Sequence, residues 1–236
     1  MTPASKLWLW IFWLSVIADL SAVYCQWNEV RYASKPAIVL SLLIFFSQVV
    51  KHGAWAFRLA LLFSLMGDVA LLFEDRDPLF FMAGLGSFLI AHIFYIVAFV
   101  GIRKLYRAGG QASQPGLQWG WIIFTVLYVG TLLYSLMPYL GELKIPVIVY
   151  ACVLGSMLVA VTHAFPKLYS KPGIICLAGA LFFVISDSLL ALNKFYMGFP
   201  LSGIAIMLTY ALAQYLLTIG AVRTYSNPNF APHPVS

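Results

Sequence analysis

The chain has 236 residues, of which 62% are hydrophobic and only 9% are charged. Ordinary soluble domains carry roughly 25% charged residues, so this composition excludes a soluble globular domain, whose surface would be one large apolar patch. The formal net charge of +6 belongs to basic residues that stand singly between apolar runs. This spacing favours a signal for membrane orientation over a nucleic-acid-binding surface.

Apolar runs of the length that spans a bilayer, roughly 20 residues, recur along the chain. The second run is the shortest, and Lys35-Pro36 is expected to start its helix. The first run lacks a convincing signal-peptide cleavage motif and is predicted to be a spanning helix. The sequence therefore predicts an all-α fold, a polytopic integral membrane bundle of about eight transmembrane helices. In chain order the runs cover residues 7–25, 36–50, 57–73, 79–101, 118–138, 145–163, 173–192 and 202–222.

Polar stretches indicate how the chain is organised. The longest, residues 106–117, divides the runs into two sets of four, so residues 1–225 are predicted to form one transmembrane domain whose halves join there. Residues 226–236 carry three prolines and are predicted to be a disordered cytoplasmic tail. Residues 61–72 and 181–192 resemble each other, each with an aspartate late in an apolar run. A parallel four-plus-four repeat and chance similarity both explain this.

Charge is distributed unevenly between the two sides of the predicted bundle. The termini and even-numbered loops collect nine basic residues and no acid, whereas the other side has five basic and five acidic residues. The positive-inside rule therefore predicts a multi-pass membrane protein with both termini in the cytoplasm. A bacterial inner membrane and an endoplasmic reticulum membrane both fit this pattern.

Three aspartates lie inside apolar runs, where a charged side chain costs about 2.5–3.5 kcal/mol on insertion scales. Asp19, Asp68 and Asp187 all stand on the order of 8–9 Å below the outer helix ends. Lys35 and Tyr150 reach the same level. We therefore expect one polar site, open toward the outer leaflet, where these side chains meet.

Helical spacing adds further polar side chains to this level. His92 and Tyr95 share one helix face, and Tyr210 and Gln214 share another. Such residues also form interhelical hydrogen bonds, and for Asp19 a hydrogen bond to a serine one turn back is a better explanation than a functional role. The chain contains no HExxH, GxSxG or Walker sequence and no cluster of metal ligands by spacing, so neither a metal nor a cofactor is predicted.

Several segments together resemble the YhhN-like membrane proteins, from about residue 35 to residue 222. This family includes the lysoplasmalogenases, which hydrolyse the vinyl ether bond of a lysoplasmalogen to a fatty aldehyde and a glycerophospho-base. The resemblance implies the same reaction here, with a lysophospholipid as substrate and membrane lipids as surroundings. The segments that carry it are Lys35-Pro36, LLFSLMGDVALL (61–72), FMAGLGSFLIAHIFYIVAF (81–99), IPVIVY (145–150), GALFFVISDSLLALNKF (179–195) and YALAQYLL (210–217).

The reaction that the resemblance implies needs two carboxyl groups. A protonated acid must add a proton to the β-carbon of the vinyl ether, and a carboxylate must steady the resulting oxocarbenium ion and activate water, as in paired-carboxylate glycosidases. We predict that Asp68 and Asp187 form this pair, with either one as the acid. Lys35 suits the phosphate of the head group. The predicted substrate-binding set is Lys35, His92, Tyr95, Tyr150, Tyr210, Gln214 and Asn193.

Two other classes of function also fit the sequence. A proton-coupled transporter would use intramembrane acids and a repeated fold, and a structural membrane protein would use the aspartates only to join helices. Protonophore-sensitive flux without lipid turnover would indicate the transporter. Aspartate substitutions that change only stability would indicate the structural protein. No nucleic acid and no obligatory protein partner are predicted.

Overall fold

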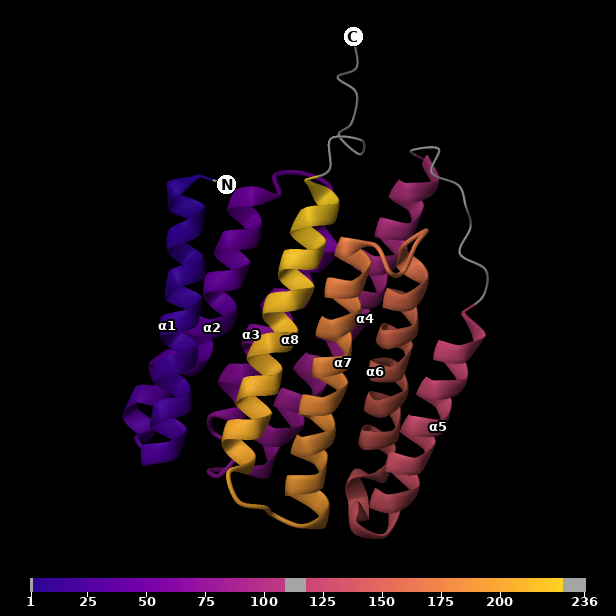
Figure 1. The fold of residues 1–236 in the computed structure, drawn as a ribbon. Coiled ribbons are helices and arrows are strands. Elements are labelled where there is room, and N and C mark those ends of the chain that lie inside the picture. The colour runs from indigo at the N-terminus through magenta and orange to yellow at the C-terminus, as the bar shows by residue number, and fades with distance from the viewer. Residues whose placement is uncertain (1, 109–117, 227–236) are drawn as a thin grey trace.

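The computed structural model describes residues 2–108 and 118–226, and within them it contains eight α-helices and no strand (Figure 1). The predicted all-α class is confirmed, and each of the eight predicted runs corresponds to one helix. Residues 109–117 of the predicted junction and residues 227–236 of the predicted tail lie outside the described residues. The helices are α1 (Pro3–Cys25), α2 (Asn28–Val49), α3 (Trp55–Leu71), α4 (Pro78–Ala108), α5 (Trp119–Leu136), α6 (Lys144–Ala164), α7 (Lys171–Ala191) and α8 (Ser202–Tyr225).

Most of these helices are long enough to cross a membrane. By length and composition, seven spans qualify among the described residues, and α3 with 17 residues is the exception. A helix of that length still falls at the lower end of the ~17–25 residues that span a bilayer. The start of α1 and the end of α8 lie at the same end of the bundle, as an even number of crossings requires (Figure 1). The cytoplasmic location of that end stays a prediction.

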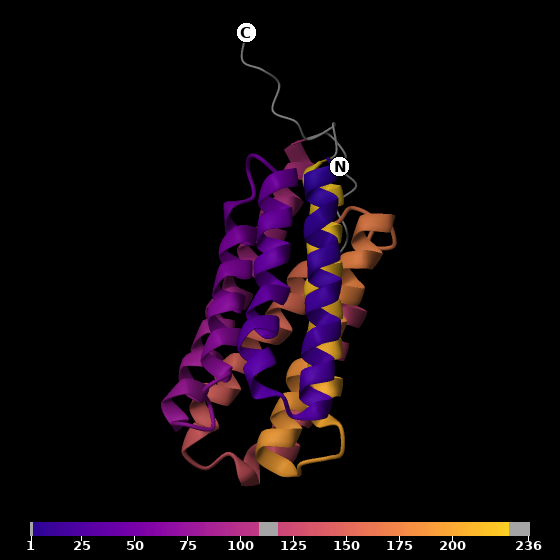
Figure 2. The same cartoon turned by 90° about the vertical axis from the view of Figure 1, so that its left-hand side faces the viewer.

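Six helices form a closed ring in the order α2, α3, α4, α6, α7 and α8, with α8 returning to α2. The two remaining helices flank the ring on opposite sides: α1 packs against α2 and α8, and α5 packs against α6 (Figures 1 and 2). Figure 2, viewed from the side of α1, shows α1 lying in front of α8. The interior of the ring is therefore bounded by both halves of the chain.

The start of α2 corrects the sequence prediction. The predicted start at Lys35-Pro36 is wrong, because α2 begins at Asn28 and continues through Pro36. A proline inside a helix removes one hydrogen bond and normally kinks or ends it, but packed membrane helices tolerate this since neighbouring groups satisfy the freed carbonyl. Lys35 consequently lies about two turns inside α2 and is buried.

Glycines allow α3 and α4 to pack closely beside the site. A Cβ on Gly67 would lie 2.6 Å from the ring of Phe88, and a Cβ on Gly84 would lie 2.6 Å from Leu71. Small residues of this kind let helix backbones approach each other in membranes. Because Gly67 directly precedes Asp68, this contact sets the position of the aspartate against α4.

Candidate functional site

A polar cavity of about 180 Å³ opens inside the ring, between α2, α3, α7 and α8. It contains both aspartates that the sequence singled out as a pair. Five of the predicted site residues are part of its wall: Lys35, Asp68, Asp187, Asn193 and Tyr210. The cavity therefore joins residues that lie more than 170 positions apart in the chain, since Lys35 and Tyr210 both belong to its wall.

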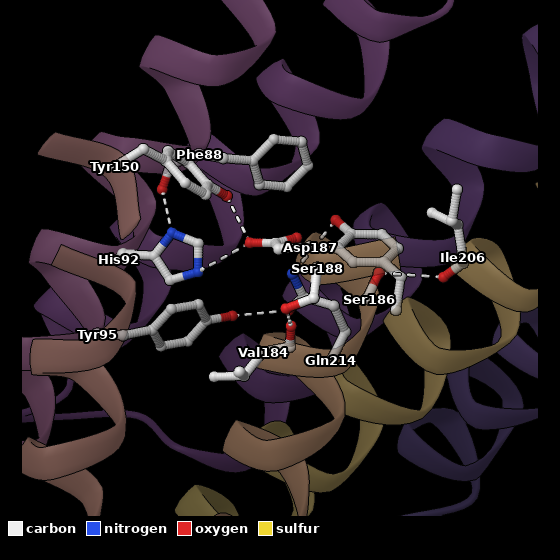
Figure 3. A network of polar contacts seen from close by, with 11 residues as sticks. Phe88, His92, Tyr95, Tyr150, Val184, Ser186, Asp187, Ser188, Ile206 and Gln214 are labelled. Carbon is white, nitrogen blue, oxygen red and sulfur yellow. Dashed lines mark hydrogen bonds and ion pairs between the residues drawn. The ribbon is translucent and has the colours of Figure 1, made fainter. Parts of the chain in front are cut away.

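The carboxyl group of Asp68 is held from α8. The hydroxyl of Tyr210 donates a hydrogen bond to Asp68 Oδ2 at 2.8 Å. The amide of Gln214 donates to the Tyr210 hydroxyl at 3.2 Å, and the hydroxyl of Tyr95 on α4 donates to Gln214 Oε1 at 2.6 Å (Figure 3). Asp68 is 1% exposed. The chain of hydrogen bonds through Tyr210, Gln214 and Tyr95 therefore fixes the orientation of a buried carboxyl group.

The carboxyl group of Asp187 has different partners. The hydroxyl of Tyr150 donates to Asp187 Oδ2 at 2.6 Å, and His92 Nε2 faces the same oxygen at 3.8 Å (Figure 3). His92 Nδ1 lies 2.6 Å from the carbonyl oxygen of Phe88. Because a carbonyl only accepts hydrogen bonds, Nδ1 is the protonated nitrogen and a neutral His92 presents the lone pair of Nε2 to Asp187.

Phe183 of α7 packs the two aspartate clusters together. Its ring is fully buried and meets the rings of His92 and Tyr210 edge-on, at centroid distances of 4.7 and 5.6 Å. It also contacts Phe88 and Tyr95 in the same geometry. Edge-to-face aromatic pairs contribute about 0.5–1.5 kcal/mol beyond area burial, so Phe183 holds residues of α4 and α8 against α7. Sequence reasoning missed Phe183, because it is one apolar residue within an apolar run.

Three of the predicted residues lie one layer behind the cavity wall. His92, Tyr95 and Gln214 are fully buried, and none of them lines the cavity. They contact residues of its wall: His92 contacts Asp187 and Phe88, and Gln214 contacts Tyr210. The arrangement therefore suits positioning of the wall residues rather than direct contact with a ligand.

Asp19 does not join the other two aspartates. It is fully buried between α1 and α2, accepts a hydrogen bond from the hydroxyl of Ser34 at 2.9 Å, and lies 3.9 Å from Arg31 Nε. The expectation that all three acids share one site is wrong for Asp19, since it is absent from the cavity wall. Its serine partner comes from the neighbouring helix rather than from one turn back on α1.

Sequence reasoning missed two charged residues of the cavity wall, Arg31 and Glu74. Arg31 lies one turn before Lys35 on α2, and this four-residue spacing would have identified it had α2 been extended across Pro36. Glu74 follows the end of α3 and accepts a hydrogen bond from Lys194 Nζ at 2.9 Å. The polar cavity thus carries two cationic side chains and three carboxyl groups.

An apolar cavity of about 50 Å³ adjoins the polar one, between α4, α6 and α7. Four residues line both cavities: Leu71, Phe88, Asp187 and Leu190. Asp187 therefore stands in the common wall, whereas Asp68 lines the polar cavity alone. The complete lining of the apolar cavity is Leu71, Phe81, Leu85, Phe88, Val147, Tyr150, Asp187, Leu190, Ala191 and Phe195.

This arrangement provides what proton transfer requires. Two carboxyl groups face one cavity large enough for water and a small polar group. Each carboxyl is oriented by a tyrosine, and cations share the cavity with them. Within the parts of the chain that the structure describes, no group of three or more His, Cys, Asp and Glu residues is arranged to hold a metal ion.

Known proteins similar to this chain are named as lysoplasmalogenases. "Lysoplasmalogenase TMEM86B" of Sus scrofa is 33% identical over 221 residues, covering 90% of this chain and 87% of that protein. "Lysoplasmalogenase TMEM86A" of Homo sapiens is 28% identical over 219 residues, covering 90% and 80%. "Lysoplasmalogenase" of Mycobacterium tuberculosis is 31% identical over 157 residues, covering 65% and 56%. No solved structure matches the chain significantly.

A family model extends this similarity to most of the helices described above. The match covers residues 30–221, which include α3 to α7, most of α2 and α8, and every residue of the polar cavity wall. It leaves out α1 and thus Asp19, the one intramembrane acid outside the cavity. The chain belongs to the YhhN family.

Proposed function

We propose that this protein is a membrane lysoplasmalogenase that hydrolyses the vinyl ether bond of a lysophospholipid to a fatty aldehyde and a glycerophospho-base. Asp68 and Asp187 act as its acid–base pair. The observation that carries the proposal is that both carboxyl groups line one polar cavity, which adjoins an apolar one. The names of its relatives support the reaction.

The first step creates and captures a cation. One aspartate, in its protonated form, delivers its proton to the β-carbon of the vinyl ether, and the π electrons form the new C–H bond. The positive charge is then shared between the α-carbon and the ether oxygen, where the other aspartate, as a carboxylate, stabilises it. Water bonds to the α-carbon as that carboxylate accepts its proton, which leaves a hemiacetal. General acid–base catalysis of this kind contributes about 10²–10⁴-fold.

The second step breaks the hemiacetal and restores both aspartates. The aspartate that gave its proton now accepts the hydroxyl proton of the hemiacetal. The bond between carbon and the glycerol oxygen breaks, and that oxygen takes the proton from the second aspartate. The sum of the two steps consumes one water and releases one aldehyde and one alcohol, so no further reactant is needed.

Other residues of the site hold the substrate and the aspartates. Tyr210 and Tyr150 orient the two carboxyl groups through their hydrogen bonds. Lys35 and Arg31 carry the positive charge that a phosphodiester requires. Asn193, in the same wall, offers both a donor and an acceptor to glycerol oxygens.

The test measures aldehyde release from a 1-alkenyl lysophospholipid by the detergent-purified protein. We expect turnover by the wild type and a loss of about 10²–10⁴-fold in each of Asp68→Asn and Asp187→Asn, with both variants still folded. The saturated 1-alkyl ether of the same lipid is the control and should give no aldehyde. A folded wild type that releases no aldehyde from either choline or ethanolamine lipids would refute the proposal. Protonophore-sensitive flux in liposomes would then favour a transporter.

A further inference from the structure

The apolar cavity between α4, α6 and α7 has no role in the acid–base steps described above. We propose that it receives the first carbons of the alkenyl chain and thereby aligns the vinyl ether with Asp187. This inference rests on the proposed hydrolase function and adds to it where the chain binds and which aspartate gives the proton.

The lining of this cavity suits a hydrocarbon. Phe81 and Leu85 of α4, Val147 of α6 and Ala191 of α7 are all apolar. The polar groups in its lining are the carboxyl of Asp187 and the hydroxyl of Tyr150, and these are hydrogen-bonded to each other. Apolar pockets with a few precisely placed polar groups are typical of ligand sites. One of the two polar groups here, the Asp187 carboxyl, is a group that the proposed reaction uses.

The volume limits how much of the chain can enter. An engineered cavity of about 150 Å³ is enough to bind benzene, so a cavity of about 50 Å³ holds only the first few carbons. The rest of the chain must continue into lipid. Leu79 on α4 and Ile145 on α6 are 73% and 75% exposed, so both helices also present apolar side chains on their outer surface.

The two cavities match the two ends of the substrate. The ether oxygen of a lysoplasmalogen carries the glycerophospho-base, and the β-carbon carries the hydrocarbon chain. With the head group beside Lys35 in the polar cavity and the chain in the apolar cavity, the β-carbon lies at their common wall. Asp187 belongs to that wall and Asp68 does not. Asp187 is therefore the proton donor, and Asp68 is the carboxylate that activates water.

The first experiment fills the apolar cavity with Val147→Phe. Val147 is 6% exposed and lines the cavity, whereas Val149 on the same helix is 45% exposed, so Val149→Phe is a matched control. Each variant is assayed on a hexadecenyl lysolipid and on its propenyl analogue, which keeps the vinyl ether and lacks the long chain. We expect Val147→Phe to lower the ratio of kcat/KM between long and short substrates about tenfold or more. Val149→Phe should leave it unchanged.

The second experiment uses the wild type and does not depend on how a variant folds. A saturated 1-alkyl lysophospholipid with a diazirine on its third chain carbon is bound and photolysed, and the labelled peptides are mapped. Labelling of α4 around Phe81 and Leu85, of α6 at Val147 or of α7 at Ala191 is the expected result.

The outcomes separate the two proposals. Aldehyde release together with labelling elsewhere, or an equal loss on both substrates in a folded Val147→Phe, overturns the chain site and leaves the hydrolase in place. Absence of aldehyde release overturns the hydrolase itself. Aldehyde release with labelling in the apolar cavity and a changed chain-length ratio supports both.

Discussion

Asp68 and Asp187 lie near the ends of two helices that run in the same direction, yet their surroundings differ. Asp68 lines only the polar cavity, which it shares with Lys35 and Arg31. Asp187 borders the apolar cavity and faces Nε2 of His92, whose other ring nitrogen is bonded to a backbone carbonyl. Each accepts a hydrogen bond from one tyrosine. The comparison teaches that two residues of one type in one cavity have different surroundings, and the proposed division into an acid and a carboxylate depends on this difference.

After the aspartate substitutions, the largest loss of activity is expected when the positive charge of Lys35, in the cavity that Asp68 lines, is removed. We expect Lys35→Met to lower kcat/KM about 100-fold, because charged groups left unpaired in a buried site cost about 2–5 kcal/mol. Lys35→Arg should retain part of the activity. Lys144→Met, at an exposed position at the start of α6, is the control for loss of a positive charge.

A substrate without phosphate distinguishes whether Lys35 binds the head group or acts on Asp68. If Lys35 binds the head group, Lys35→Met should lose its defect on an alkenylglycerol. A defect of the same size on both substrates would show instead that Lys35 acts on Asp68, and it would contradict the assignment of Lys35 to phosphate.

The next test compares the two tyrosines. A hydrogen bond to a charged group contributes about 1.5–3 kcal/mol and one between neutral groups about 0.5–1.5 kcal/mol. Because Asp68 is proposed to act as a carboxylate and Asp187 as a protonated acid, Tyr210→Phe should lower kcat about 10- to 100-fold. Tyr150→Phe should lower it only about two- to tenfold. The measurement is kcat at saturating substrate, and the opposite order would reverse the roles of the two aspartates.

The smallest effect is expected outside the site. Asp19→Asn should keep kcat/KM within about twofold of the wild type and lower the free energy of unfolding by about 1 kcal/mol, because its bond to Ser34 joins α1 to α2. Thermal unfolding in detergent and the aldehyde assay measure the two effects. A loss of activity comparable to that of Asp68→Asn would mean that the catalytic centre includes α1.

The number of helices and the two aspartates of the cavity could be predicted from the sequence. Spanning length and the cost of a charge in an apolar run are local properties, which a single segment reveals. The start of α2 could not be predicted, because the usual effect of proline is also local and the packing that overrides it at Pro36 is not. Arg31 was not predicted as a site residue because the helix was expected to begin at Lys35-Pro36, after Arg31.

The pairing of side chains across helices could not be predicted from the sequence. Tyr210 and Asp68 are 142 positions apart, and Tyr150 and Asp187 are 37 apart. Their meeting depends on the ring order, in which α6 rather than α5 packs against α4. Since lipid is as apolar as the protein interior, the residues that face lipid and those that line the apolar cavity look alike in hydropathy. Val147 and Val149 are an example.

The wall that the two cavities share also affects how products separate. Under the proposed hydrolysis, the glycerophospho-base is left in the polar cavity and is soluble in water, while the aldehyde keeps its chain in the apolar cavity and in lipid. The two products therefore enter different phases when the bond breaks, and recombination requires both to return to one wall. The bilayer then acts as an extracting solvent: it lowers the concentration of aldehyde at the site and so favours the forward reaction.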